Sequence, residues 1–229
     1  MNQNEKKEKA VRKLPQKRVE AILTALKKKY PDAVCGLRYE GDGWKLMVLS
    51  RLSAQCTDKR VNDTAPTLFV KYPTPCAMAN SELCELEETI RPCGLFRSKA
   101  RDIRAACRML TEEYNGVLPD EIDALLKFPG IGRKIANLII GDLYGKPAIV
   151  ADTHCMRVSA RIGFSKEGIK DPLLTEKVLK ANIPPEEQND FCHRLVLLGR
   201  EICKAGKPNC RECPLSAVCE HAKQENRKG

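Results

Sequence analysis

Four cysteines near the end of the chain have the spacing that most clearly indicates chemistry. The pattern C-x6-C-x2-C-x5-C is formed, in a short segment with Pro and Gly, by Cys203, Cys210, Cys213 and Cys219. Four converging thiolates repel one another unless a cation neutralises them, so the spacing predicts a metal centre. A four-cysteine zinc site and a cubane iron-sulfur cluster both suit this ligand set, and spacing alone excludes neither. Exposed basic residues between the ligands could contact phosphates: Lys204, Lys207 and Arg211.

A glycine-containing turn forms a second candidate site at residues 125–134, LLKFPGIGRK. Gly130 and Gly132 permit positive φ and leave backbone N–H groups uncovered just before a predicted helix. Such a turn can grip a phosphate backbone without reading bases, whereas an ordinary corner between two helices needs no particular residue after the glycines. The turn therefore favours contact with nucleic acid.

Lys134 follows this turn in the first turn of the predicted helix, where the positive end of the helix dipole disfavours a second charge. A lysine that is neutral there would be a nucleophile. Attack on a sugar C1′ would expel a base and leave a Schiff base, through which β-elimination breaks the strand. Taken alone, a lysine at a helix start is usually a solvated charge.

Asp152 lies just ahead of another predicted helix, in the segment VADTH. We expect its carboxylate to cap that helix. The same carboxylate could deprotonate an incoming amine or stabilise oxocarbenium charge, which glycosidic cleavage requires. His154, close by, is interpreted as a hydrogen-bonded support.

The overall composition agrees with a polyanionic partner. The 229 residues include 40 Lys and Arg against 30 Asp and Glu, which gives a formal net charge of +10. The sequence has neither a long apolar run nor a signal-peptide core, so we expect a soluble protein of a prokaryotic cytoplasm with no membrane partner. In that reducing compartment the remaining cysteines are predicted to be small buried hydrophobes: Cys35, Cys56, Cys76, Cys84, Cys93, Cys107, Cys155 and Cys192.

Helical periodicity runs through nearly every ordered stretch and predicts an all-α fold. A nearly continuous apolar helix is expected at 44–52, interrupted by Ser50 and Arg51, which must face polar groups. Ser98 and Asp120 are predicted as helix N-caps. The amphipathic helices are expected around 19–26, 61–69, 83–90, 103–110, 122–126, 135–139, 153–162, 173–180 and 186–198.

Together these residues resemble the endonuclease III family of helix-hairpin-helix DNA glycosylases, over about residues 17–222. LLKFPGIGRKIAN is similar to the family hairpin with Lys134 at the nucleophile position, and VADTH places Asp152 on the catalytic aspartate. The four cysteines match the family's [4Fe-4S] ligand spacing, so the resemblance implies iron rather than zinc.

The resemblance also implies the architecture and the DNA contacts. A six-helix barrel at 36–146, with the helix-hairpin-helix at about 121–144, would face a cluster domain built from 1–35 and 147–229, with duplex DNA across the cleft of a monomer. In LSAQCTD, Gln55 would fill the space left by a flipped nucleotide, and Leu95 would wedge into the base stack. The remaining implied DNA contacts are Gly130, Gly132 and Arg133. Arg51 departs from the aliphatic residue common in related sequences.

The implied activity is base excision repair: removal of oxidised pyrimidines from duplex DNA, followed by β-elimination at the abasic site. Adenine glycosylases look similar but lack this lysine and carry a further C-terminal domain, and monofunctional mismatch glycosylases usually replace the lysine too. A noncatalytic DNA-binding module is the alternative from another class, and it would need neither Lys134 nor Asp152.

Overall fold

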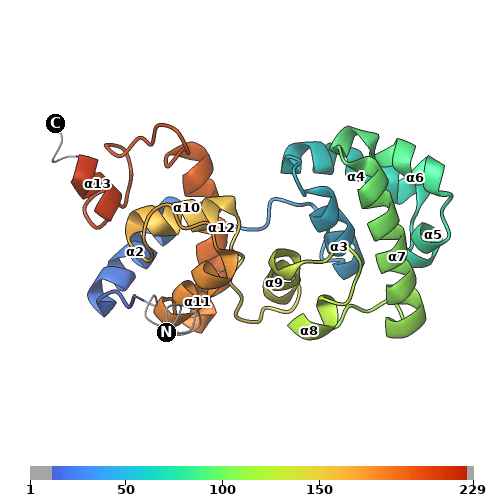
Figure 1. The fold of residues 1–229 in the computed structure, drawn as a ribbon, viewed down its shortest axis with the longest axis horizontal. Helices are drawn as coiled ribbons and strands as arrows, with labels where there is room; N and C mark the ends of the chain where they lie inside the picture. The colour runs from blue at the N-terminus through green and yellow to red at the C-terminus, as the bar shows by residue number, and fades with distance from the viewer. Residues whose placement is uncertain (1–11, 226–229) are drawn as a thin grey trace, which may run out of the picture. The chain divides into compact units, whose positions relative to one another are not determined.

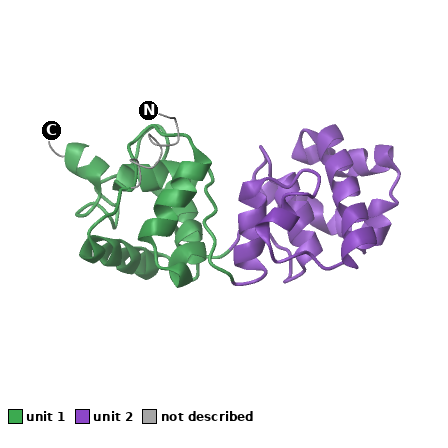
Figure 2. Cartoon of the chain, turned by 60° about the horizontal axis from the view of Figure 1, so that its bottom comes forward, with its two compact units in different colours: residues 1–34, 146–229 green, residues 35–145 purple. Residues whose placement is uncertain are grey.

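The computed structural model describes residues 12–225, and every regular element in that part of the chain is a helix (Figure 1). The all-α prediction is therefore confirmed. The chain divides into two compact units: unit 1 is Met1–Val34 with Lys146–Gly229, and unit 2 is Cys35–Gly145 (Figure 2). None of the helices in the described range is long and apolar enough to cross a membrane.

Unit 1 joins an N-terminal helix to the C-terminal third of the chain. The predicted stripe of α2 is buried as expected, at Val19, Ile22, Leu23 and Leu26. Helix α10 packs on α12, and nearby Phe164 meets the Phe191 ring of α12 edge to face at 5.9 Å. The helices of this unit are α2 (Gln16–Lys29), α10 (Thr153–Ile162), α11 (Pro172–Asn182), η2 (Pro185–Glu187), α12 (Gln188–Glu201) and α13 (Glu220–Glu225).

Unit 2 is built around α3 and the long α7. Helix α3 is buried almost all round, as its sequence predicts, and Trp44 at its start packs edge to face on Phe69 at 5.1 Å. Helices α5, α6 and α3 all pack on α7. The helices of this unit are α3 (Gly43–Leu52), α4 (Asp58–Lys71), α5 (Pro75–Ala79), α6 (Leu83–Ile90), η1 (Arg91–Cys93), α7 (Phe96–Tyr114), α8 (Ile122–Leu125) and α9 (Arg133–Asp142).

Two predicted helix caps are wrong. Helix α7 begins before Ser98, because Leu95 occupies the N-cap position in a left-handed conformation, and the Ser98 hydroxyl donates to the Leu95 carbonyl at 3.0 Å. The N-cap of α8 is Glu121 instead of Asp120, and its side chain makes no capping hydrogen bond. A left-handed residue or an extended backbone can start a helix without a capping side chain, which a search for Ser or Asp misses.

The two polar residues inside α3 have different outcomes. Arg51 has the polar partner that the sequence requires, since its Nε and Nη2 donate to Asp102 Oδ2 of α7 at 2.9 and 2.6 Å. Ser50 is buried, and within the described residues its hydroxyl has no hydrogen-bond partner, so the expectation of a polar neighbour is wrong there.

The scattered cysteines only partly follow the prediction of burial. Cys93, Cys107, Cys155 and Cys192 are buried. Cys76 and Cys84 are exposed, because they lie on the short helices α5 and α6, whose buried positions are taken by other residues. Cys35 and Cys56 are partly exposed. A cysteine on a short amphipathic helix thus follows the face it occupies.

Candidate active site and metal centre

The predicted hairpin consists of α8, a glycine-containing turn and α9, all within unit 2. Gly130 has φ +75°, and a Cβ atom there would lie 2.7 Å from Arg51 Nε and 2.8 Å from Asp102 Cβ. Only glycine fits such a position, because L-residues rarely adopt this φ and the Arg51–Asp102 ion pair fills the space. The Arg51–Asp102 ion pair therefore packs against the turn at Gly130. This contact accounts for the presence of an arginine at position 51 of a largely apolar helix.

Gly132 does not share this constraint. It is the N-cap of α9 with φ −93°, and a Cβ atom there would meet no atom within 4 Å. Of the two glycines that permit positive φ, Gly132 therefore does not use this freedom, because the chain is already extended where it enters the helix.

Lys134 lies where the sequence places it, in the first turn of α9. Arg133 and Lys134 are the first two residues of that helix and both are exposed, while its buried side is formed by Ala136, Asn137, Ile139, Ile140 and Gly141. The first turn contains no acidic residue. The exposed start of α9 thus combines two basic side chains with the positive end of the helix dipole.

Gln55 and Leu95 share an unusual backbone conformation. Their φ values are +52° and +49°, and both residues are exposed, Leu95 by 55%. A non-glycine residue in this region costs about 1–3 kcal/mol unless the surroundings hold it, and such strain gathers at functional sites. The two residues predicted to enter DNA are therefore presented to solvent on strained loops of unit 2.

Asp152 caps α10 in unit 1, as predicted. Its carboxylate accepts a hydrogen bond from the Cys155 N–H at 2.6 Å, and its own N–H donates to the Val150 carbonyl at 2.8 Å. The side chain is partly exposed. Asp152 therefore belongs to unit 1, whereas Lys134 belongs to unit 2.

His154 has the supporting role that the sequence suggests. Arg157 Nη2 lies 3.2 Å from His154 Nδ1. A Cβ atom at Gly199 would lie 2.7 Å from His154 Nδ1, so α12 approaches this pair closely.

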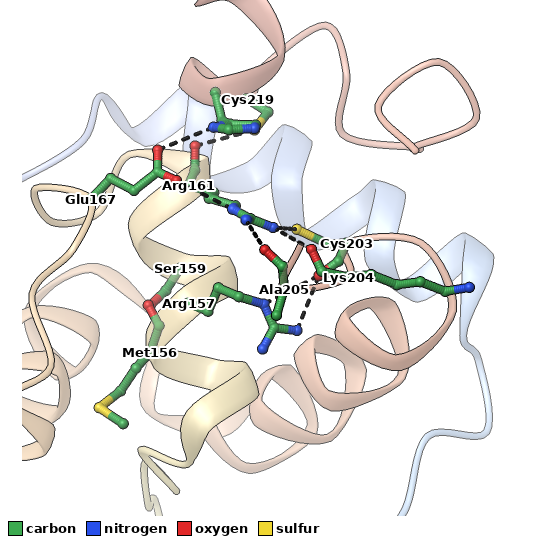
Figure 3. A network of polar contacts seen from close by, with 10 residues as sticks. Met156, Arg157, Ser159, Arg161, Glu167, Cys203, Lys204, Ala205 and Cys219 are labelled. Atoms are coloured by element: carbon green, nitrogen blue, oxygen red, sulfur yellow. Dashed lines mark hydrogen bonds and ion pairs between the residues drawn. The ribbon is translucent and has the colours of Figure 1, made fainter. Parts of the chain in front are cut away.

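Two arginines of α10 fasten the start of the cysteine segment (Figure 3). Arg157 donates to the Gly199 and Cys203 carbonyls, each at 3.0 Å. The nearly buried Arg161 donates to the Lys204 and Ala205 carbonyls, each at 2.8 Å, and Nη1 lies 3.5 Å from Cys203 Sγ. Sequence reasoning missed both, although their i, i+4 spacing places them on one helix face.

The four thiols are close enough to influence one another's ionisation. Burial is the main reason that the pKa of Cys213 rises to about 11, and the charges of Cys219, Cys203 and Cys210 add to it. Burial, followed by neighbouring cysteines, raises the pKa of Cys210 as well. A metal would have to displace these protons, because only thiolates bind it.

Four cysteine thiols are the right kind of donor set for a zinc or iron-sulfur centre. The Cys219 thiol donates to the Arg161 carbonyl at 3.2 Å. Between residues 12 and 225, no three or more Cys, His, Asp or Glu side chains are arranged closely enough to hold a metal ion. Ligation would thus require the cysteine side chains to come closer together. Lys204, Lys207 and Arg211 are exposed around this segment.

Known proteins share both the sequence and the fold. Residues 48–185 match the HhH-GPD superfamily of base excision DNA repair proteins. Endonuclease III of Synechocystis sp. is 41% identical over 93% of this chain and 97% of its own length, and that of Bacillus subtilis is 40% identical over 93% and 96%.

The chain belongs to the endonuclease III family. The solved structure of a non-covalent endonuclease III–DNA complex aligns with a TM-score of 0.87 and 42% identity, covering 93% of this chain and 99% of that one. A trapped endonuclease III–DNA covalent intermediate aligns with the same score and identity, over 93% and 100%. The resemblance inferred from the sequence is confirmed, and endonuclease III proteins carry a [4Fe-4S] cluster.

The two hairpin glycines give a test of the turn geometry. Gly130→Ala should lower the free energy of unfolding by about 2 kcal/mol or more, because it adds strain and overlaps the Arg51–Asp102 pair. Gly132→Ala is the matched control and should cost less than about 1 kcal/mol, since its Cβ atom enters open space at an N-cap. Denaturant unfolding of both variants measures the difference, and equal losses would contradict the geometry.

Proposed function

We propose that this protein is a bifunctional base excision repair enzyme, which removes oxidised pyrimidines from duplex DNA and then cleaves the strand at the abasic site. Membership of the endonuclease III family supports the paired glycosylase and lyase activities. The observation that carries the assignment is Lys134, exposed in the first turn of α9 directly after the glycine-containing turn.

In this proposal Lys134 is the nucleophile. Its amine forms a bond to the sugar C1′ while the glycosidic bond breaks, and the electron pair leaves with the base, which takes up a proton. One amine proton replaces the proton taken up by the departing base, and the second passes to O4′ as the C1′–O4′ bond breaks and the ring opens, which leaves a Schiff base between Lys134 and C1′. Loss of a proton from C2′ then expels the 3′ phosphate by β-elimination, and hydrolysis frees the lysine.

Asp152 is assigned the supporting chemistry. Its carboxylate would take the proton from the attacking amine or stabilise the positive charge that develops on the sugar. The hydrogen bond from the Cys155 N–H fixes this carboxylate in place, since one of its oxygens is tied to the helix start.

The DNA contacts are assigned to unit 2. The turn at Gly130 and Gly132, with Arg133, would hold a phosphate through backbone N–H groups and charge. Leu95 would enter the base stack and Gln55 would fill the space of the flipped nucleotide, which offsets part of the unstacking cost. We identify unit 2 with the barrel domain and unit 1 with the cluster domain.

The four cysteines of unit 1 are proposed to hold a [4Fe-4S] cluster: Cys203, Cys210, Cys213 and Cys219. Bound there, the cluster supplies structural cross-linking, because four protein thiolates leave no open position for substrate. Arg157 and Arg161 already hold the segment that carries these ligands. The cytoplasm of a bacterium is the proposed setting, which agrees with the bacterial relatives.

The nucleophile is tested by reductive trapping. Wild-type protein should form a borohydride-trapped adduct with abasic duplex DNA, and Lys134→Ala should lose it, with strand cleavage reduced on the order of 10³-fold or more. Lys59→Ala is the control, because it removes another exposed charge of unit 2, one that is paired with Asp63. Trapping by Lys134→Ala would show that another amine attacks. Base release without trapping by the wild type would indicate a monofunctional glycosylase.

The two roles of Asp152 are separable by substitution. Asp152→Asn keeps an oxygen that can accept the Cys155 N–H, so its thermal stability should stay near that of the wild type. Asp152→Ala loses the cap and about 1 kcal/mol of stability. Both should lower base excision by about 10²- to 10⁴-fold, since both remove the carboxylate. Undiminished excision by Asp152→Asn would refute a catalytic role.

The cluster is tested by metal content. Anaerobically purified protein should show broad visible absorbance and iron with inorganic sulfide, and Cys213→Ser should lose most of both. Cys84→Ser, which changes an exposed cysteine of α6, should retain them. Zinc in place of iron in the wild-type protein would overturn the cofactor assignment.

A further inference from the structure

Lys99 is a completely buried lysine near the start of α7. Its exposed fraction is 0%, and it is among the largest fully buried side chains in the part of the chain described. Lysine is almost never buried in this way without compensation, because an ammonium loses its hydration. Burial is the main cause that lowers the pKa of Lys99, and the Arg51 charge lowers it further, against the opposing influence of Cys56 and Cys93.

The compensation comes from two backbone carbonyls. Lys99 Nζ donates to the Leu52 carbonyl at 2.8 Å and to the Cys93 carbonyl at 2.8 Å. Leu52 is the last residue of α3 and Cys93 is the last residue of η1. Carbonyls at helix ends have no partner within their helix and carry partial negative charge. One ammonium thus satisfies the ends of two helices that lie far apart in the sequence.

Each of these helix ends leads directly into one of the strained loops. Gln55 follows Leu52 by three positions, and Leu95 follows Cys93 by two. Both residues have left-handed φ values and exposed side chains. The Nζ atom of Lys99 therefore holds two carbonyls, that of Leu52 just before the Gln55 loop and that of Cys93 just before Leu95.

A purely space-filling role explains this arrangement poorly. Methionine would fill the same volume without the desolvation cost of a charge, and replacing buried charges by apolar residues is often neutral or stabilising. What an apolar residue cannot do is hold two carbonyls at fixed positions. The bonds of Lys99 therefore provide geometry at the two loops rather than core volume.

We propose that Lys99 is a positioning residue, which holds the Gln55 and Leu95 loops in the conformation that enters DNA when a damaged nucleotide is flipped out. The inference rests on the proposed function. Lys99 touches neither the sugar nor the base, and it acts through the two loops. Preorganised loops enter DNA without a further cost of ordering, so the loss of Lys99 should fall on nucleotide flipping and not on the chemistry at Lys134.

The test compares two duplex substrates under single-turnover conditions. Lys99→Met should slow base release from a thymine glycol duplex about tenfold or more, because a stacked, paired base must be flipped. Cleavage at a preformed abasic site should slow much less, since no base has to leave the stack. Leu110→Ala is the control for lost stability, because it removes a buried side chain of the same helix away from both loops. It should affect both substrates equally.

A mutant cycle tests whether Lys99 acts through the loops. In a Gln55→Ala and Leu95→Ala background, Lys99→Met should cause little further loss of base release, because the side chains that it positions are gone. Fully additive losses would overturn the proposal, and so would equal slowing of both substrates by Lys99→Met.

A second variant keeps the test decisive if Lys99→Met fails to fold. Lys99→Gln retains an amide donor without the charge, and the selective loss on the thymine glycol duplex should be intermediate. Equal slowing of both substrates by Lys99→Gln, relative to the wild type, would then count against the proposal. Inactivity of the wild-type protein on both substrates would refute the proposed function itself, whereas an active wild type without selective loss refutes only the role of Lys99.

Discussion

The loops of the candidate sites are short, and buried or partly buried cations that donate hydrogen bonds to backbone carbonyls hold them in place. Lys99 secures the ends of α3 and η1 in unit 2. Arg157 and Arg161 secure the start of the cysteine segment in unit 1. A segment with few apolar side chains of its own cannot be ordered by hydrophobic burial, so the direction and strength of charge-assisted hydrogen bonds replace it. The other features of the candidate sites depend on this support.

The hairpin shows the same principle with an ion pair. Arg51 and Asp102 join α3 to α7 and fill the space behind Gly130. The turn is therefore held by a side-chain pair from elsewhere in unit 2, and not by its glycines alone. Because the pair is only partly exposed, water screens it less than it would a surface pair, although the turn that it supports faces solvent.

Helix positions were well predicted because amphipathic periodicity is a local property. The buried stripe of α2 and the bounds of α10 follow directly from residue types at helical spacing. Helix starts were predicted less well, as Ser98 and Asp120 show. The start of α7 depends on the left-handed Leu95, and no local preference of leucine indicates that conformation. Tertiary contacts that hold the backbone override the preference.

The sequence by itself determined the all-α class, the family, the cap at Asp152 and the placement of Lys134 after a glycine turn. The helices, the cap and the turn follow from residue types a few positions apart along the chain, and the family follows from several such local motifs together. Only the tertiary structure decided the partner of Arg51, which lies 51 positions away, and the carbonyl of Leu52, which lies 47 positions from Lys99. A charged residue in an apolar helix indicates that a polar partner must lie close to it. The identity of that partner depends on how helices that are distant in the sequence pack together, and residue spacing along the chain does not record that packing.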